Sequence, residues 1–85
     1  DWLRRNEMNI SIEYCVQWNY EPRALSLGDE LTNKFGNNIV VLKPGDRGAF
    51  EVYVNYQLIF SKLQLDRFPN EGEIITFIED LLKVI

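Results

Sequence analysis

The alternation of apolar and polar residues predicts a strand and then a helix in the first half of the chain. Between Asn9 and Cys15 the two kinds of residue alternate one by one, as in a strand with one buried face. From Pro22 to Phe35 apolar residues recur at helical spacing, Pro22 suits a first helical turn, and Gly36 suits a left-handed cap. We therefore expect a strand over 9–15 and a helix over about 22–35.

Three more strands are expected after this helix. The run Ile39–Leu42 is short and continuously apolar, which is typical of a strand covered on both faces. Residues 43–48 have the composition of a turn, so we place the end of that strand at Leu42. Phe50–Val54 alternates, and after a short turn Leu58–Phe60 has the pattern of the return strand of an antiparallel hairpin.

A broad apolar stripe predicts a closing helix that starts near Asn70. Glu73 stands three residues further on and fits a capping box. The stripe is wide enough to be ordinary cover for a core, and it consists of Ile74, Ile75, Phe77, Ile78, Leu81, Leu82 and Ile85. The order β-α-β-β-β-α, with a right-handed crossover between the first two strands, predicts an α/β (α+β) two-layer domain with a four-stranded mixed sheet. This is the thioredoxin-like layout.

Length and composition limit this fold to one domain. A chain of 85 residues has room for a single compact core, which we assign to residues 9–85. Residues 1–8 are set aside as an N-terminal extension, either an added tag remnant or the end of a longer precursor. With 46% hydrophobic and 26% charged residues, the chain has the composition of a folded globular protein.

The charge and the apolar runs argue against nucleic-acid and membrane partners. The net charge of -4 repels phosphate backbones and anionic lipid surfaces. No apolar run approaches the ~20 residues of a membrane span, and residues 1–7 lack the apolar core of a signal peptide. We expect a cytoplasmic protein, a monomer or weak dimer, that binds neither nucleic acid nor membrane.

One cysteine and the absence of histidine restrict the available chemistry. An internal disulfide, the usual Cys/His zinc sites and His-based triads cannot form within one chain, and we expect no metal. Cys15 lies between the first strand and the helix, where free backbone N–H groups and the helix dipole favour a thiolate. A reactive thiol and a small buried apolar side chain are about equally consistent with this position.

Several short motifs resemble the selenoprotein W (Rdx) family. The match extends over about residues 9–85, and its motifs are Glu13-Tyr14-Cys15-x-x-x-Asn19-Tyr20-x-Pro22-Arg23-Ala24, Gly48-Ala49-Phe50-Glu51-Val52, Ser61-Lys62 and Arg67-Phe68-Pro69. The resemblance implies the same β-α-β-β-β-α fold and a thiol-dependent redox activity linked to glutathione. In the family this activity centres on a Cys-x-x-Sec or Cys-x-x-Cys motif.

The corresponding motif of this chain is Cys15-Val16-Gln17-Trp18. Cys15 matches the family's first cysteine, whereas Trp18 stands at the selenocysteine or second cysteine position and supplies neither a nucleophile nor a resolving group. A single thiol needs an external thiol such as glutathione to release a mixed disulfide. One hypothesis is a monothiol redox protein that acts through Cys15, without a cofactor, with glutathione as co-substrate or a protein thiol or disulfide as partner. The other is a redox-inactive interaction module that uses the Cys15–Trp18 loop, with Val16 and Gln17 on the site's rim.

Further residues are candidates for the rim of this site. Trp18 either packs as a lid over the cysteine or contacts a partner from an exposed loop. Tyr20, Arg23 and Arg67 either belong to the rim or are solvated loop residues beside a loop that Phe68 anchors. In the first case Arg67 offers a cation to a carboxylate.

The remaining polar candidates receive no chemical role. Glu13 and Glu51 alternate with apolar residues in their strands, so we expect both on the solvent side of the sheet. The glycine-containing segment 43–48 fits neither a Walker A motif nor a dinucleotide fingerprint.

Overall fold

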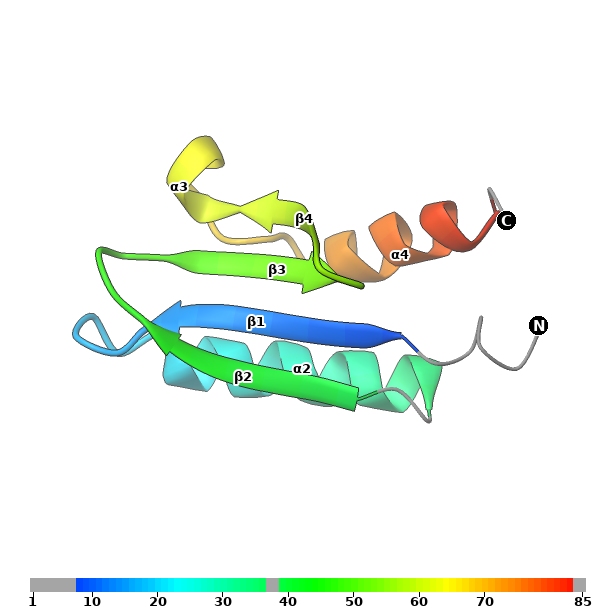
Figure 1. Cartoon of the computed structure of the whole chain (residues 1–85), viewed down its shortest axis with the longest axis horizontal. Coiled ribbons are helices and arrows are strands. Elements are labelled where there is room, and N and C mark those ends of the chain that lie inside the picture. Colours follow the sequence, from blue (N-terminus) through cyan, green and yellow to red (C-terminus); the bar gives the residue numbers. More distant parts are fainter. Residues whose placement is uncertain (1–7, 37–38, 84–85) are drawn as a thin grey trace.

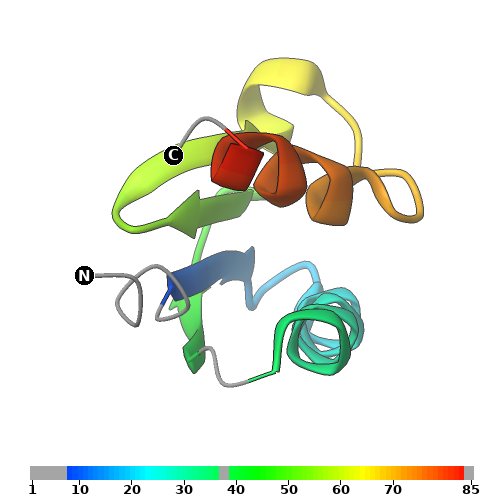
Figure 2. The ribbon, with the colours of Figure 1, turned by 90° about the vertical axis from the view of Figure 1, so that its right-hand side faces the viewer.

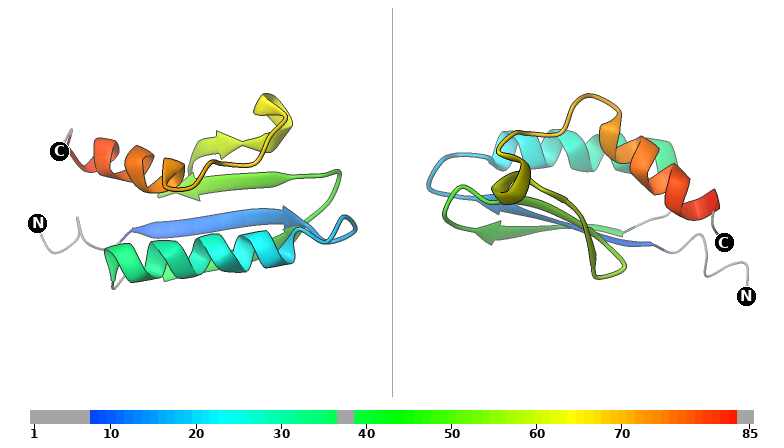
Figure 3. Two further views of the ribbon diagram at one scale, coloured as in Figure 1. Left: turned by 180° about the vertical axis from the view of Figure 1, so that it is seen from behind. Right: turned by 90° about the horizontal axis from the view of Figure 1, so that it is seen from above.

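The computed structural model describes residues 8–36 and 39–83 of the chain (Figure 1). In chain order its elements are β1 (Asn9–Cys15), α2 (Glu21–Phe35), β2 (Ile39–Gly45), β3 (Phe50–Val54), β4 (Gln57–Ser61), α3 (Lys62–Leu65) and α4 (Glu73–Lys83). The sheet has the order β2-β1-β3-β4, with β1 and β2 parallel and the other neighbours antiparallel. Figure 2 and the right-hand view of Figure 3 show α2 and α4 on the same face of the sheet. The predicted two-layer, thioredoxin-like fold is therefore confirmed, with α3 as one added turn.

The core lies between the sheet and the two longer helices. β1 and β3 are the central strands, and their paired residues Ile12 and Val52 are both fully buried. Leu31 of α2, together with Ile74 and Ile78 of α4, is exposed by 1% or less. Each such side chain stabilises the fold by about 1.5–3 kcal/mol when it leaves water. Apolar residues therefore recur every two positions in the strands and about every 3.6 positions in the helices because both kinds of element face the same core.

The first strand and helix agree closely with the sequence pattern. β1 has the predicted bounds, and α2 begins one residue earlier than predicted, at Glu21. Gly36 follows the helix with a φ of 75°, and its N–H donates to the Thr32 carbonyl at 2.9 Å. Glycine adopts a positive φ readily, so the helix ends there as expected.

β2 is longer than predicted and forms one edge of the sheet. We expected it to end at Leu42, but its parallel pairing with β1 continues through Lys43, Pro44 and Gly45. Pro44 fits because the outer side of an edge strand has no ladder hydrogen bonds, so a missing N–H can be tolerated there. The expectation of cover on both faces was also wrong, since Val41 is 43% exposed.

The chain after the hairpin differs most from the sequence pattern. β4 extends one residue beyond its predicted range at each end, and the short helix α3, which follows it directly, was not predicted. α4 begins at Glu73 rather than near Asn70, although the Glu73 carboxylate accepts a hydrogen bond from the Asn70 N–H at 2.8 Å, one half of the expected capping box. Its stripe is only partly buried, because Phe77 and Leu81 are 43% and 36% exposed, and Ile85 lies outside the described residues. No helix in the described ranges is long and apolar enough to cross a membrane.

Candidate functional site

Cys15 ends β1, between the sheet and α2, where the sequence placed it. Its N–H donates to the Ala49 carbonyl at 2.8 Å, and its own carbonyl accepts from the Tyr20 N–H at 3.0 Å. The side chain is fully buried, with an exposed fraction of 0%. The backbone of Cys15 is thus fixed from two sides, and its thiol has no contact with solvent.

The 16–19 turn, residues Val16 to Asn19, connects β1 to α2 and exposes its side chains. Val16 and Trp18 are 55% and 60% exposed, and Gln17 is exposed as well. Main-chain hydrogen bonds fix the turn: the Val16 N–H donates to the Gly45 carbonyl at 3.2 Å, and the Asn19 N–H donates to the Val16 carbonyl at 3.0 Å. Asn19 has a φ of 60°, a left-handed conformation that asparagine accepts more easily than most residues. The last three residues of the predicted motif therefore face solvent on a fixed turn, whereas Cys15 does not.

The indole of Trp18 lies against the loop between β2 and β3. A Cβ atom on Gly48 would come within 2.5 Å of Cζ3 of the indole, so the ring rests directly on the glycine backbone. Gly48 also has a φ of 76°, which residues with a side chain rarely adopt. Part of the indole packs while the residue stays 60% exposed, so the packing and contact hypotheses each describe part of Trp18.

Aromatic rings continue from Trp18 into the core. Their centroids are 6.1 Å apart for Trp18 and Tyr20, 4.7 Å for Tyr20 and Phe68, and 5.3 Å for Phe68 and Phe50, all with steep interplanar angles. Such edge-to-face pairs are favourable beyond the area that they bury. The Arg23 guanidinium lies 4.0 Å from the centroid of the Phe68 ring. Tyr20 therefore lies beside Trp18, Arg23 lies beside Phe68, and Phe68 anchors the group to the core.

Two cations flank these rings. Besides Arg23, the Lys62 ammonium group lies 5.5 Å from the Tyr20 ring and 5.3 Å from the Phe68 ring. Among the residues that the structure describes, neither cation forms an ion pair with a carboxylate. We call Trp18, Tyr20, Arg23, Lys62 and Phe68 the aromatic–basic surface. The sequence analysis gave Lys62 no role, although its place in the Ser61-Lys62 motif was a signal.

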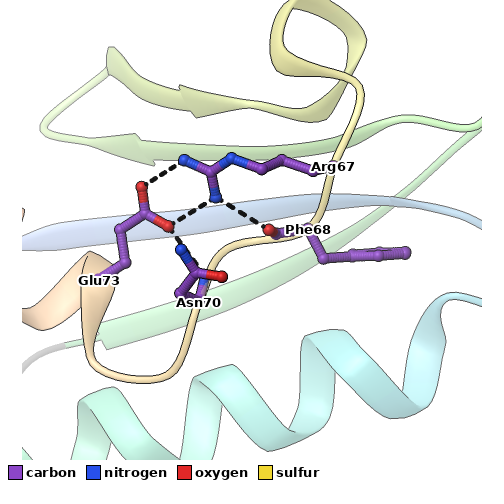
Figure 4. A network of polar contacts seen from close by, with 4 residues as sticks. All are labelled: Arg67, Phe68, Asn70 and Glu73. Atoms are coloured by element: carbon purple, nitrogen blue, oxygen red, sulfur yellow. Dashed lines mark hydrogen bonds and ion pairs between the residues drawn. The ribbon is translucent and has the colours of Figure 1, made fainter.

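Arg67 is held elsewhere, by Glu73 at the start of α4. Its guanidinium donates to the two carboxylate oxygens of Glu73 at 2.8 and 2.9 Å and to the Phe68 carbonyl at 3.1 Å (Figure 4). The hydrogen bonds from Arg67 and from the Asn70 N–H lower the pKa of Glu73 to about 2. The cation that the sequence analysis offered to a ligand carboxylate is thus bound to Glu73.

Glu51 is buried, which contradicts its expected solvent-side position. It is 6% exposed, and its carboxylate accepts hydrogen bonds from the Ser61 hydroxyl at 2.5 Å and from the Leu63 N–H at 3.3 Å. The Ser61 hydroxyl in turn accepts from the Gln64 N–H at 3.1 Å and caps α3. The carboxylate can be buried because α3, which was not predicted, supplies its partners. Glu13, which pairs with Glu51 across β1 and β3, is partly buried.

Fold and site together define a thioredoxin-like, two-layer domain with one cysteine at the junction of its first strand and first helix. Within residues 8–36 and 39–83, no group of three or more His, Cys, Asp or Glu side chains could hold a metal ion. The chain belongs to the Rdx family, whose family model matches residues 9–80. The resemblance inferred from the short motifs is therefore confirmed.

Curated relatives agree with this assignment. The chain is 34% identical over 68 residues to Migration and invasion enhancer 1 of Bos taurus, covering 80% of this chain and 59% of that protein. It is 33% identical over 82 residues to Selenoprotein V of Homo sapiens, covering 87% of this chain and 23% of that protein. The chain thus spans less than two thirds of either relative.

Solved structures support the fold independently. A selenoprotein W-related protein from Vibrio cholerae has a TM-score of 0.83 and 32% sequence identity, covering 89% of this chain and 98% of that one. A protein from Bordetella parapertussis has a TM-score of 0.80 and 28% identity, covering 86% of this chain and 95% of that one. The domain therefore has the selenoprotein W-like form of the thioredoxin-like fold.

Proposed function

We propose that this chain is a redox-inactive Rdx-family domain that binds a protein partner through the 16–19 turn and the adjoining aromatic–basic surface. The proposal is carried by the burial of the Cys15 thiol next to Val16 and Trp18, which are 55% and 60% exposed. A thiolate must reach its substrate sulfur before it can exchange with it. A contact surface needs only exposed side chains on a backbone that is held in place. The 16–19 turn meets that requirement, because main-chain hydrogen bonds fix its backbone.

Trp18 has the properties of an interface anchor. Tryptophan is enriched among the residues that dominate binding energy, because its large ring loses little conformational entropy when a partner buries it. The indole already rests on Gly48 and forms an edge-to-face pair with Tyr20, so little further ordering is needed on binding. Arg23 and Lys62 add positive charge nearby. The partner that fits is a protein segment with an apolar side chain flanked by Asp or Glu.

A monothiol redox role is the second candidate, favoured by family membership and by the position of Cys15 at the strand–helix junction. The 16–19 turn would first have to open and expose the thiol. The Cys15 thiolate would then attack the glutathione sulfur of a protein–glutathione mixed disulfide, form its own mixed disulfide with glutathione and release the protein thiolate. A free glutathione thiolate would attack the glutathione sulfur of the Cys15 mixed disulfide, form glutathione disulfide and release the Cys15 thiolate. Trp18 supplies no sulfur, so the second step depends on an external thiol.

Photo-crosslinking tests the contact role. A photoreactive amino acid in place of Gln17, an exposed residue of the turn, should capture a protein partner when cells expressing the domain are illuminated. Adding Trp18→Ala should abolish the crosslink. Adding Leu25→Ala, which changes a 50% exposed apolar residue of α2, should leave the crosslink unchanged. A crosslink that survives Trp18→Ala contradicts the proposal.

Incubation with oxidised glutathione separates the two candidates. The native protein should gain no glutathione adduct in its intact mass, whereas the protein unfolded in urea should be modified at Cys15. Cys15→Ser reports any adduct formed elsewhere. Rapid formation of an adduct on the native fold would support the monothiol role instead.

A further inference from the structure

A groove lies between α2 and the 67–73 loop, which leads from α3 to α4. Its volume is about 380 Å³, at the small end of the range for ligand sites. Leu27 of α2 and the rings of Phe50 and Phe68 give it an apolar lining. Arg23 also lines it, and Arg23 and Phe68 belong to the aromatic–basic surface as well. The groove is therefore continuous with the surface that we propose for partner binding.

The charged residues of the groove are separated along α2. Glu30 follows Arg23 by seven residues, which is ~10.5 Å along a helix that rises ~1.5 Å per residue. The third charged residue, Glu71, lines the groove from the loop. Figure 4 shows that the loop passes from Phe68 to Asn70 in the direction in which α2 runs, so Glu71 lies toward the Glu30 end. The groove thus has a cation at one end and two carboxylates at the other.

These three charges lack ionic partners inside the part of the chain that the structure describes. Arg23, Glu30 and Glu71 take part in none of its ion pairs. Lys34 follows Glu30 by one helical turn, but its ammonium group is bound to the Glu79 carboxylate at 3.6 Å. The other residues that line the groove are uncharged. A ligand with charges in the opposite order would therefore find both ends of the groove available.

We propose that this groove binds an extended segment of the partner protein, with an acidic residue at Arg23 and a Lys or Arg residue at Glu30 and Glu71. An extended chain advances ~3.3 Å per residue, so the ~10.5 Å correspond to about three residues. Lys62 of the aromatic–basic surface adds positive charge at the Arg23 end, and the net charge of -4 favours a basic residue at the other.

The inference rests on the proposed function and adds a basic residue to the partner segment described there. Trp18 precedes α2, and the groove extends from Arg23 toward the C-terminal end of that helix. The partner segment therefore carries, in order, an apolar residue at Trp18, an acidic residue at Arg23 and a basic residue about three positions further on.

Titration of the full chain with short peptides, followed by the nuclear magnetic resonance shifts of its backbone amides, tests this order. The first peptide is acetyl-Leu-Asp-Ala-Ala-Arg-amide, and the second has alanine in place of arginine. Because exposed ion pairs are weak, the first should bind about three- to five-fold more tightly, with a Kd of about 1 mM. A third peptide, in which aspartate and arginine are exchanged, should bind no more tightly than the second.

Matched variants locate the basic residue. Glu30→Gln and Glu71→Gln should each reduce the preference for the first peptide over the second, and the double variant should remove it. Asp29→Asn makes the same change of charge at an exposed residue of α2 that does not line the groove, and it should keep the preference. The amide spectrum of each variant establishes that it is folded.

The outcomes distinguish this inference from the proposed function. Equal binding of the first and second peptides, with shifts around Trp18 and Arg23, would overturn the inference and leave the contact role standing. No shifts with any peptide would contradict both. A preference that survives in the double variant or is lost in Asp29→Asn would overturn the inference alone. So would equally large shifts with free arginine, which would indicate a small zwitterion as the ligand.

Discussion

The 16–19 turn and the 67–73 loop, which ends at the first residue of α4, both overlap segments that resemble family motifs, and their side chains behave in opposite ways. In the turn, hydrogen bonds of the main chain fix the backbone, while Val16 and Trp18 remain exposed. In the loop, the side chains bond to each other, since Arg67 is held by Glu73 and by the Phe68 carbonyl. A family-like motif therefore offers a contact surface only where its side chains remain exposed.

The largest expected effect on stability comes from a change at Gly48, against which the Trp18 ring of the 16–19 turn packs. Gly48→Ala adds a side chain at a φ of 76° and 2.5 Å from the Trp18 ring, so it should lower the free energy of unfolding by about 2–4 kcal/mol. Gly72→Ala, in the loop, has a similar φ of 79° but no atom within 4 Å of the new Cβ. It should cost only about 1–2 kcal/mol. Urea denaturation measures both values.

A double variant sharpens the same test. In a Trp18→Ala background the new Cβ at Gly48 no longer meets the indole, so Gly48→Ala should cost about as much as Gly72→Ala. If Gly48→Ala lowers the free energy of unfolding equally with and without Trp18, the indole moves aside easily. The packing against Gly48 then does not fix the turn.

A medium effect is expected from the loop. Glu73→Gln should lower the free energy of unfolding by about 0.5–1 kcal/mol at neutral pH, because it breaks the ion pair with Arg67 and weakens the bond from the Asn70 N–H. The pKa of Glu73 is lowered to about 2, so this stabilisation is complete above the unfolded pKa of about 4.3 and is lost as the pH falls through about 2. Urea denaturation between about pH 5 and about pH 2 should show the wild type and Glu73→Gln converging. A difference that persists at the low end contradicts the assigned pairing.

The smallest effect on stability is expected from the most exposed side chain of the turn. Trp18→Ala should change the free energy of unfolding by less than about 1 kcal/mol, since the residue is 60% exposed, and yet abolish the Gln17 crosslink. Arg67→Ala should do the reverse, losing stability while keeping the crosslink. The proposed difference between the turn and the loop is contradicted if Trp18→Ala unfolds the domain or if Arg67→Ala loses the crosslink.

Local sequence patterns were sufficient for much of the fold. The alternation in β1 and the helical spacing in α2 each depend on one buried face, so both elements could be predicted from nearby residues. β2 could not be bounded in this way, because its last three residues are strand only through pairing with β1. α3 was missed for a similar reason: its first turn is stabilised by Glu51, from a different strand.

The site was predictable in position but not in accessibility. The order of strand and helix placed Cys15 correctly, but its burial depends on tertiary packing that no local pattern encodes. Trp18 rests on Gly48, thirty positions further along the chain, so its partly packed state was hidden as well. Glu73 was identified as a capping residue, and the pattern gave no sign that the same carboxylate also binds Arg67.

The burial of the Cys15 thiol behind a fixed turn is tested most directly by its rate of alkylation with iodoacetamide, followed by mass spectrometry at increasing urea concentration. The native protein should react at least about 100-fold more slowly than the unfolded protein, and its rate should rise in step with global unfolding. A native rate within a few-fold of the unfolded one, without dependence on urea, would contradict the account and point to an accessible redox thiol.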